Sequence, residues 1–197
     1  KPFYGINYGS IGFLMNNESN EGLDNIISSS QKIELKALEM SAEDINGKTY
    51  KSIAFNEVAM MRQSSQATKI SIKINNVERM NELICDGVMV STAAGSTAYN
   101  LSAHGSIIPL DSKLLALTPI SAFRPRRWRG ALLSESTRIN FFVKDPEKRS
   151  SSVTADHNEF RDIQNVKIQS SDKDYCTILF DSNHSMEERI LKEQFYS

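Results

Sequence analysis

Alternating apolar and polar residues from Lys32 onward limit most strongly what this chain can fold into. In KIELKALEM, residues 32–40, Ile33, Leu35 and Ala37 fall at every second position, and residues 69–74 repeat the pattern. Successive side chains of a strand point to opposite faces of its sheet, so each run predicts a strand with one buried and one wet face. The pattern predicts a β-rich domain of the sandwich type.

Turn and helix signals divide the rest of the chain. Asn46-Gly47 and Asn75-Asn76 are typical of hairpin turns between two strands. Further short strands are expected at residues 137–143, 152–156, 165–169 and 175–180. Near the end, Ser185 and Glu188 form a capping box for a helix. Its apolar face would consist of Met186, Ile190, Leu191 and Phe195.

Charge and apolar content indicate the compartment and exclude some partners. With 40% hydrophobic residues, 24% charged residues and a net charge of −1, the composition is that of a globular intracellular domain and argues against nucleic acid as the main partner. No apolar run approaches the roughly 20 residues that cross a bilayer, so we expect a cytoplasmic protein without a membrane partner. Cys85 and Cys176 are too few for a disulfide framework and are expected to be buried strand residues.

The stretch DGVMVSTAAGSTAYNLSAHG, residues 86–105, contains the strongest candidate site. Residues 88–90 predict a short buried strand, and the five small residues 91–95 would let a ligand approach the backbone closely. From the residues alone, an ordinary capped helix after a strand is the alternative.

A short helix is expected directly after those small residues. Ser96 and Thr97 are candidate caps, and the first amides of the helix would be unpaired donors suited to phosphate or ribose oxygens. Those amides belong to Ala98, Tyr99 and Asn100. Gly105 is expected to end the helix in the left-handed conformation.

The segment STAAGSTAYNLSAHG closely resembles the signature of the NAD kinase family, whose usual form is STPTGSTAY followed by a Ser. Four further segments resemble that family in the same order along the chain. They are GINYGSIGFLMN at residues 5–16, FNEV at 55–58, LTPISAFRPRRWRG at 117–130 and VTADHNEF at 153–160. The last segment, FDSNHSMEERILKEQF, resembles the tail of a bacterial branch of the family.

The resemblance covers nearly the whole chain and implies a two-domain fold. Residues 1–30 would be an α/β N-terminal remnant of a nucleotide-binding domain, and residues 31–181 a β-rich, β-sandwich C-terminal domain that binds NAD. Residues 182–197 would form a helix that returns to the N-terminal domain.

The resemblance also implies an activity and partners. The family transfers a phosphoryl group from ATP, or polyphosphate in some members, to the 2′-hydroxyl of the adenosine ribose of NAD, which gives NADP. Such transfer depends on positioning and on charge neutralisation, here by a divalent metal, Mg²⁺, on the phosphates. A homo-oligomer, dimer or tetramer, is implied as well.

Site residues are implied by the same motifs. Asn56 and Glu57 would bind the adenosine part of NAD, Asp86 a ribose or the nicotinamide side, and Tyr99 the adenine. Without the resemblance, Asn56-Glu57 would be a strand-end turn and His157 a solvated loop residue. The expected NAD-binding set is Asn56, Glu57, Asp86, Ser91, Thr97, Ala98, Tyr99, Asn100, Leu101, Ser102, Ser121, Phe123, His157 and Asn158.

Two segments of this set carry more specific expectations. Ser121 and Phe123 fall in the segment that reaches a neighbouring subunit's site in family tetramers. The four arginines of residues 124–129 favour a subunit interface or a phosphate contact over nucleic acid. His157 and Asn158 would lie on the nicotinamide side.

One family motif does not occur in these 197 residues. It is Gly-Gly-Asp-Gly, whose Asp the family uses as catalytic base upstream of GINYGSIGF. The chain opens with Lys1 rather than Met and is therefore expected to be the C-terminal portion of a longer protein, with the catalytic residue unassigned. A non-catalytic module that binds NAD and oligomerises is the alternative. A lipid kinase of the diacylglycerol-kinase-like group is a third possibility, which the GSTAY segment disfavours.

Overall fold

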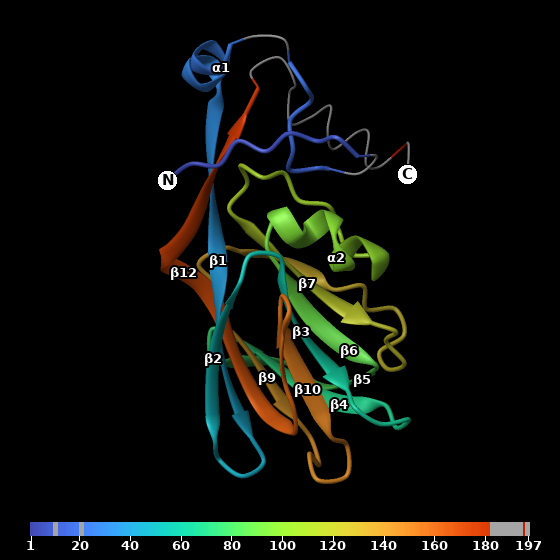
Figure 1. Cartoon of the computed structure of the whole chain (residues 1–197). Coiled ribbons are helices and arrows are strands. Elements are labelled where there is room, and N and C mark those ends of the chain that lie inside the picture. Colours follow the sequence, from blue (N-terminus) through green and yellow to red (C-terminus); the bar gives the residue numbers. More distant parts are fainter. Residues whose placement is uncertain (10–11, 20–21, 182–194, 196–197) are drawn as a thin grey trace.

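Two six-stranded antiparallel sheets pack face to face in the computed structural model, which describes residues 1–9, 12–19, 22–181 and 195 (Figure 1). The first sheet has the order β2-β1-β12-β9-β4-β5, and the second β11-β10-β3-β6-β7-β8. In that order, the first consists of Thr49–Ala54, Gln31–Asp44, Ile163–Phe180, Ile139–Val143, Thr68–Ile74 and Val77–Cys85. The second consists of Asn158–Phe160, Ser151–Ala155, Glu57–Arg62, Gly87–Ser91, Leu114–Ile120 and Ala131–Ser134. The predicted β-sandwich is confirmed.

Both predicted hairpins are present. Gly47 joins β1 to β2 with φ +82°, and Asn75 and Asn76 join β4 to β5 with φ +49° and +65°. Gly and Asn adopt this left-handed region more readily than other residues, which is why these dipeptides end one strand and start the next.

The long strand β1 buries one set of side chains at its start and the opposite set later. Ile33 and Leu35 are buried, but after a register shift between Lys36 and Leu38 the buried positions are Leu38 and Met40. Across this shift, the two steps from Lys36 to Leu38 on β1 correspond to five steps from Tyr175 to Ser170 on β12, and such an irregularity reverses which side chains face inward. The strand therefore contributes to two cores, one between the sheets and one near β1's start.

The partner of β1 differs from the prediction. Residues 165–169 and 175–180 belong to one continuous strand, β12, rather than to two strands. β12 pairs with β1 on both sides of this irregularity, and residues 171–174 between the two paired stretches have no strand-pairing partner in β1.

The helix α1, Leu23–Ser29, lies at the end of β1 far from the β1–β2 hairpin (Figure 1). In the described part of residues 1–16, the β-type contacts are isolated bridges of Phe3 with Ile178 and of Ile6 with Asn16. The C-terminal helix expected at Ser185–Phe195 lies outside the described residues except for Phe195.

Both cysteines lie in strands, as predicted. Cys85 is buried, whereas Cys176 is only half-buried on β12. Within the described ranges, no helix has the length and apolar character that crossing a bilayer requires.

Candidate functional site

The turn between β2 and β3, residues 55–57, is held through its backbone by two loops from elsewhere in the chain. Its three N–H groups donate to the Asp156 carboxylate, from Phe55 at 2.7 Å, Asn56 at 3.0 Å and Glu57 at 3.2 Å. The Asp156 amide in turn donates to the Glu57 carbonyl at 3.1 Å. Asp156 lies at the end of β10, with φ +50°.

The loop after β6 holds the other side of this turn. Thr92 donates its hydroxyl to the Phe55 carbonyl at 2.6 Å and its amide to the Asn56 carbonyl at 2.9 Å. Gly95 packs so closely that a Cβ there would lie 2.2 Å from the Asn56 carbonyl oxygen. The small residues that were expected to let a ligand approach the backbone therefore also let this turn pack closely against it.

The Glu57 side chain is the group that points most clearly to a ligand. Its Oε2 atom is buried without a hydrogen-bond partner among the described residues. Burial, and then the charge of Asp156, raise the pKa of Glu57 to about 7. Because a buried polar atom without a partner is costly, a ligand hydroxyl or amine would stabilise this position.

Tyr99 and Asp86 lie in the same electrostatic neighbourhood as Glu57. Burial raises the pKa of the Tyr99 phenol, and the charges of Glu57 and Asp86 raise it further. The phenol lies 3.7 Å from the Met61 sulfur, and 38% of Tyr99 is exposed. Asp86, between β5 and β6, accepts a 2.6 Å hydrogen bond from Arg62 Nε. Three predicted site residues from different elements therefore converge.

The predicted helix is shorter and begins differently from the expectation. Residues Ala94–Thr97 form a 3₁₀ turn, followed by the four-residue α2, Tyr99–Ser102. The Ala98 amide, expected to be unpaired, donates to the Gly95 carbonyl at 2.9 Å. This hydrogen bond closes the 3₁₀ turn, so that amide is not open to a ligand.

Gly105 has a different role from the predicted helix end. The left-handed residue is His104, with φ +62°. Gly105 is instead required by space, because a Cβ there would lie 2.0 Å from Asn100 Oδ1. The Asn100 side chain fills the room that a larger residue would need.

Two predicted site residues, Asn100 and Ser91, are fully buried. Asn100 donates Nδ2 to the carbonyls of Ser96 and Ser106, both at 3.0 Å, and accepts from the Thr118 hydroxyl at 2.6 Å. Ser91 donates its hydroxyl to the Thr92 carbonyl at 3.0 Å. Both side chains organise the loop from inside.

A hollow of about 330 Å³ adjoins the exposed side of α2 and brings together two more predicted residues, Ser102 and Ser121. Its other lining residues include Tyr99, His104, Arg126, Trp128 and Arg129. The predicted residues Thr97 and Leu101 are half-buried near α2, and the predicted residue Phe123 is exposed outside this lining. The guanidinium groups of Arg124 and Arg126 lie 4.9 and 5.2 Å from the Phe123 ring centre.

The β10–β11 turn contributes a residue that was not in the predicted set. His157 and Asn158 are exposed, and Asn158 Nδ2 donates to the Ser52 hydroxyl at 3.3 Å. Asp156, one residue earlier, is the residue that contacts the Asn56-Glu57 turn. Thr92 and Arg62 were also missed. Their partners lie far away along the chain, so no local pattern marks them.

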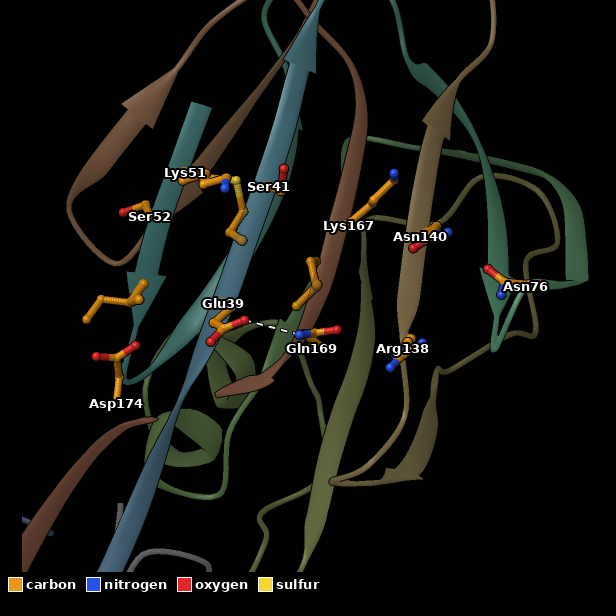
Figure 2. A pocket seen from close by; sticks show the side chains of 13 residues that line it. Glu39, Ser41, Lys51, Ser52, Asn76, Arg138, Asn140, Lys167, Gln169 and Asp174 are labelled. Carbon is orange, nitrogen blue, oxygen red and sulfur yellow. Dashed lines mark hydrogen bonds between the residues drawn. The ribbon is translucent and has the colours of Figure 1, made fainter. Parts of the chain in front are cut away.

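A larger hollow than the one beside α2, about 950 Å³, lies elsewhere, on the polar face of the first sheet (Figure 2). Glu39 there accepts from Ser171 Oγ at 2.8 Å and Gln169 Nε2 at 3.1 Å, and these bonds lower the pKa of Glu39. Lys51, Arg138 and Lys167 are among its other lining residues. None of the predicted site residues lines this hollow.

Comparison with known proteins gives consistent matches. Residues 55–180 match the family model of the ATP-NAD kinase C-terminal domain. The chain is 47% identical over 195 residues to a NAD kinase of Hyphomonas neptunium, covering 99% of this chain and 76% of that protein. A NAD kinase of Mesorhizobium japonicum is 52% identical over 195 residues, with the same coverage.

Two solved structures share the fold at lower sequence identity. Yeast NADH kinase, in complex with NADH, has a TM-score of 0.80 and 21% identity, covering 98% of this chain and 57% of that one. A NAD kinase from Archaeoglobus fulgidus, in complex with ATP, has a TM-score of 0.75 and 22% identity, covering 98% of this chain and 73% of that one.

Proposed function

The chain belongs to the NAD kinase family, and on this premise we propose that its described residues form the acceptor site for NAD. The reaction transfers a phosphoryl group from ATP or polyphosphate to the 2′-hydroxyl of the adenosine ribose, which gives NADP. The bond between the terminal phosphorus and the donor's bridging oxygen breaks as the bond to the 2′-oxygen forms, and the 2′-hydroxyl loses its proton to a base.

The unpartnered Oε2 of Glu57 is the observation that carries this proposal. Protonated or ionised, that carboxyl accepts a hydrogen bond from a ribose hydroxyl or the adenine amino group. Tyr99, partly exposed and close to Glu57, offers an aromatic face for the adenine. Asp86, whose charge Arg62 balances, would bind a ribose or the nicotinamide side.

We assign the remaining predicted residues by their exposure. Ser102 and Ser121, in the hollow with Arg126 and Arg129, would contact polar edges of the dinucleotide. Direct contact with NAD remains a prediction for Thr97, Ala98, Leu101, His157 and Asn158. Ser91 and Asn100 would support the site from the interior rather than touch NAD, because their side chains are buried and used internally.

Mg²⁺ would accompany the donor phosphates in this reaction, but the described residues do not fit as its ligands. No group of three or more His, Cys, Asp or Glu side chains gathers among them, and Asp86 is already paired with Arg62. We therefore assign no step through the metal to these residues.

The oligomeric state and location are part of the same proposal. We propose a dimer or tetramer located in the cytoplasm. The oligomer is supported by the exposed Phe123, which lies under two arginine side chains in a segment that the family resemblance places between subunits. Such an aromatic and arginine cluster is typical of protein interfaces.

A second candidate function is binding of NAD without catalysis. It is favoured by one observation, that the Gly-Gly-Asp-Gly motif does not occur within the 197 residues. In this case the chain would hold the acceptor while another segment supplies the base.

Two measurements on protein of confirmed 22.1 kDa mass test these candidates. Calorimetry measures NAD binding, and an NADP assay with Mg²⁺ and either ATP or polyphosphate measures transfer. NADP formation would support the kinase and identify its donor. NAD binding without transfer would support the acceptor module, whereas absence of NAD binding would overturn both.

A further inference from the structure

The turn with Asn56 and Glu57 is joined by seven hydrogen bonds to Asp156 and Thr92, which lie far from it in sequence. We propose that Asp156 and Thr92 are positioning residues for NAD, which hold this turn from opposite sides without touching the dinucleotide. The inference rests on the proposed function, because it assumes that Asn56 and Glu57 contact NAD.

The hydrogen bonds of Asp156 indicate positioning rather than direct binding. One carboxylate oxygen accepts from Phe55 and the other from both Asn56 and Glu57. A carboxylate has no donors when ionised, and these acceptor sites are engaged by charge-assisted bonds to three consecutive amides. The backbone of Asp156 also donates to Glu57, so both residues are fixed relative to each other.

Thr92 completes the support from the other side. Its hydroxyl donates to Phe55 and accepts from the Gly95 amide at 3.1 Å, while its own amide donates to Asn56. The Thr92 side chain therefore links the turn to the loop that leads to Tyr99. Through these bonds, the spacing between Glu57 and Tyr99 depends on Thr92.

The consequence for binding follows from the orientation of Glu57. The backbone amide and carbonyl of Glu57 are both hydrogen-bonded to Asp156, so the point from which the Glu57 side chain extends is fixed. Its buried Oε2 has no described partner to hold it in place, so the backbone sets where that oxygen meets a ligand. If the turn were less rigid, the side chains of Asn56 and Glu57 would occupy several positions, and NAD would bind more weakly to the folded protein.

A merely structural role predicts something different. In that case, substitutions at Asp156 or Thr92 would lower the unfolding temperature but leave the NAD affinity of the folded protein unchanged. The test therefore measures the dissociation constant of NAD by calorimetry, well below the unfolding midpoint of each variant.

The central variant is Asp156→Asn, with Asp162→Asn as matched control. Asp162 also has a left-handed backbone, φ +56°, and lies beyond β11, but its carboxylate accepts none of the turn's amides. Asn tolerates this backbone at both positions. We expect NAD binding to weaken at least tenfold in Asp156→Asn and to change less than twofold in the control.

A second pair of variants tests the opposite side of the turn. Thr92→Val removes the hydroxyl, and we expect a similar loss of NAD affinity, whereas Thr92→Ser keeps the hydroxyl and should restore most of it. This pair decides the question if Asp156→Asn does not fold. If the folded variants Asp156→Asn or Thr92→Val bind NAD as tightly as the unmodified protein, the inference is wrong. If the unmodified protein binds no NAD, the proposed function fails instead.

Discussion

Glu57→Gln should make the protein more stable at neutral and alkaline pH, and much less so in acid. The pKa of Glu57 is raised to about 7 from an ordinary value of 4.5, by burial and by Asp156. Below pH 4.5 the carboxyl is protonated in both the folded and unfolded states and carries no penalty. As pH rises from 4.5 to 7, the unfolded chain releases a proton that the folded protein keeps, so stability falls. Above pH 7 the full penalty remains.

The size of this penalty follows from the difference between the two pKa values. At about 1.36 kcal/mol per pH unit, full ionisation of Glu57 would cost the folded state about 3 kcal/mol. Solvent reaches part of the side chain, and screening reduces that cost, so we expect about 1–2 kcal/mol. Gln has a similar shape but no charge to lose, and it would therefore recover this amount at pH 8.5 and much less at pH 5.

Urea unfolding of both proteins at pH 5 and pH 8.5 measures the effect. The quantity that matters is the stability gained by Glu57→Gln at pH 8.5 minus the gain at pH 5, since this difference cancels the pH dependence of every other group. Glu147→Gln, at an exposed loop position, serves as control and should show no such difference. An equal effect of Glu57→Gln at both pH values would refute the argument.

Substitutions at three further site residues, with one control, test packing, buried hydrogen bonding and stacking. Gly95→Ala places a Cβ 2.2 Å from the Asn56 carbonyl oxygen, which is backbone that cannot rotate away, so we expect a loss of about 1–3 kcal/mol in urea unfolding. Gly22→Ala, which has open space at the N-cap of α1, should cost no more than about 0.5–1 kcal/mol, and a loss as large as that of Gly95→Ala would contradict this interpretation. Asn100→Leu breaks a buried network of three hydrogen bonds and should cost about 2–4 kcal/mol; a thermal midpoint within one degree of the unmodified protein would contradict it. Tyr99→Phe keeps the ring and should retain NAD affinity, whereas Tyr99→Leu should weaken it about tenfold in calorimetry, and equal affinities would argue against stacking.

Much of the sandwich could be predicted because its signals are local. Alternation in residues 32–40 and 69–74 marks strands, and Asn46-Gly47 and Asn75-Asn76 supply the left-handed backbone that a tight hairpin needs. The register shift near Leu38 had no such signal, because it depends on how β1 and β12 pair along their whole length. The polar residues in the middle of β12 likewise show no local strand pattern, so the sequence predicted a loop between two strands there.

Part of the candidate site could also be predicted from sequence. The resemblance identified Asn56, Glu57, Asp86 and Tyr99 from their motifs, and the structure brings Glu57, Asp86 and Tyr99 into one neighbourhood. The resemblance could not show which residues of the signature are exposed to a ligand and which, like Asn100, are fully buried. Burial depends on neighbours such as Thr118, which lies on another element.

Most of the strands, the tight turns, the family and most of the residue types at the site could be predicted from the sequence, since each depends on neighbouring residues or on a contiguous motif. How these residues are held depends on the tertiary structure. The Asn56-Glu57 turn is bonded to Asp156, about a hundred positions later, and to Thr92 on a third loop. Hydrogen bonds between such distant segments form only once β10 and β6 have paired with β3 in the second sheet, and they leave no periodicity or spacing along the chain.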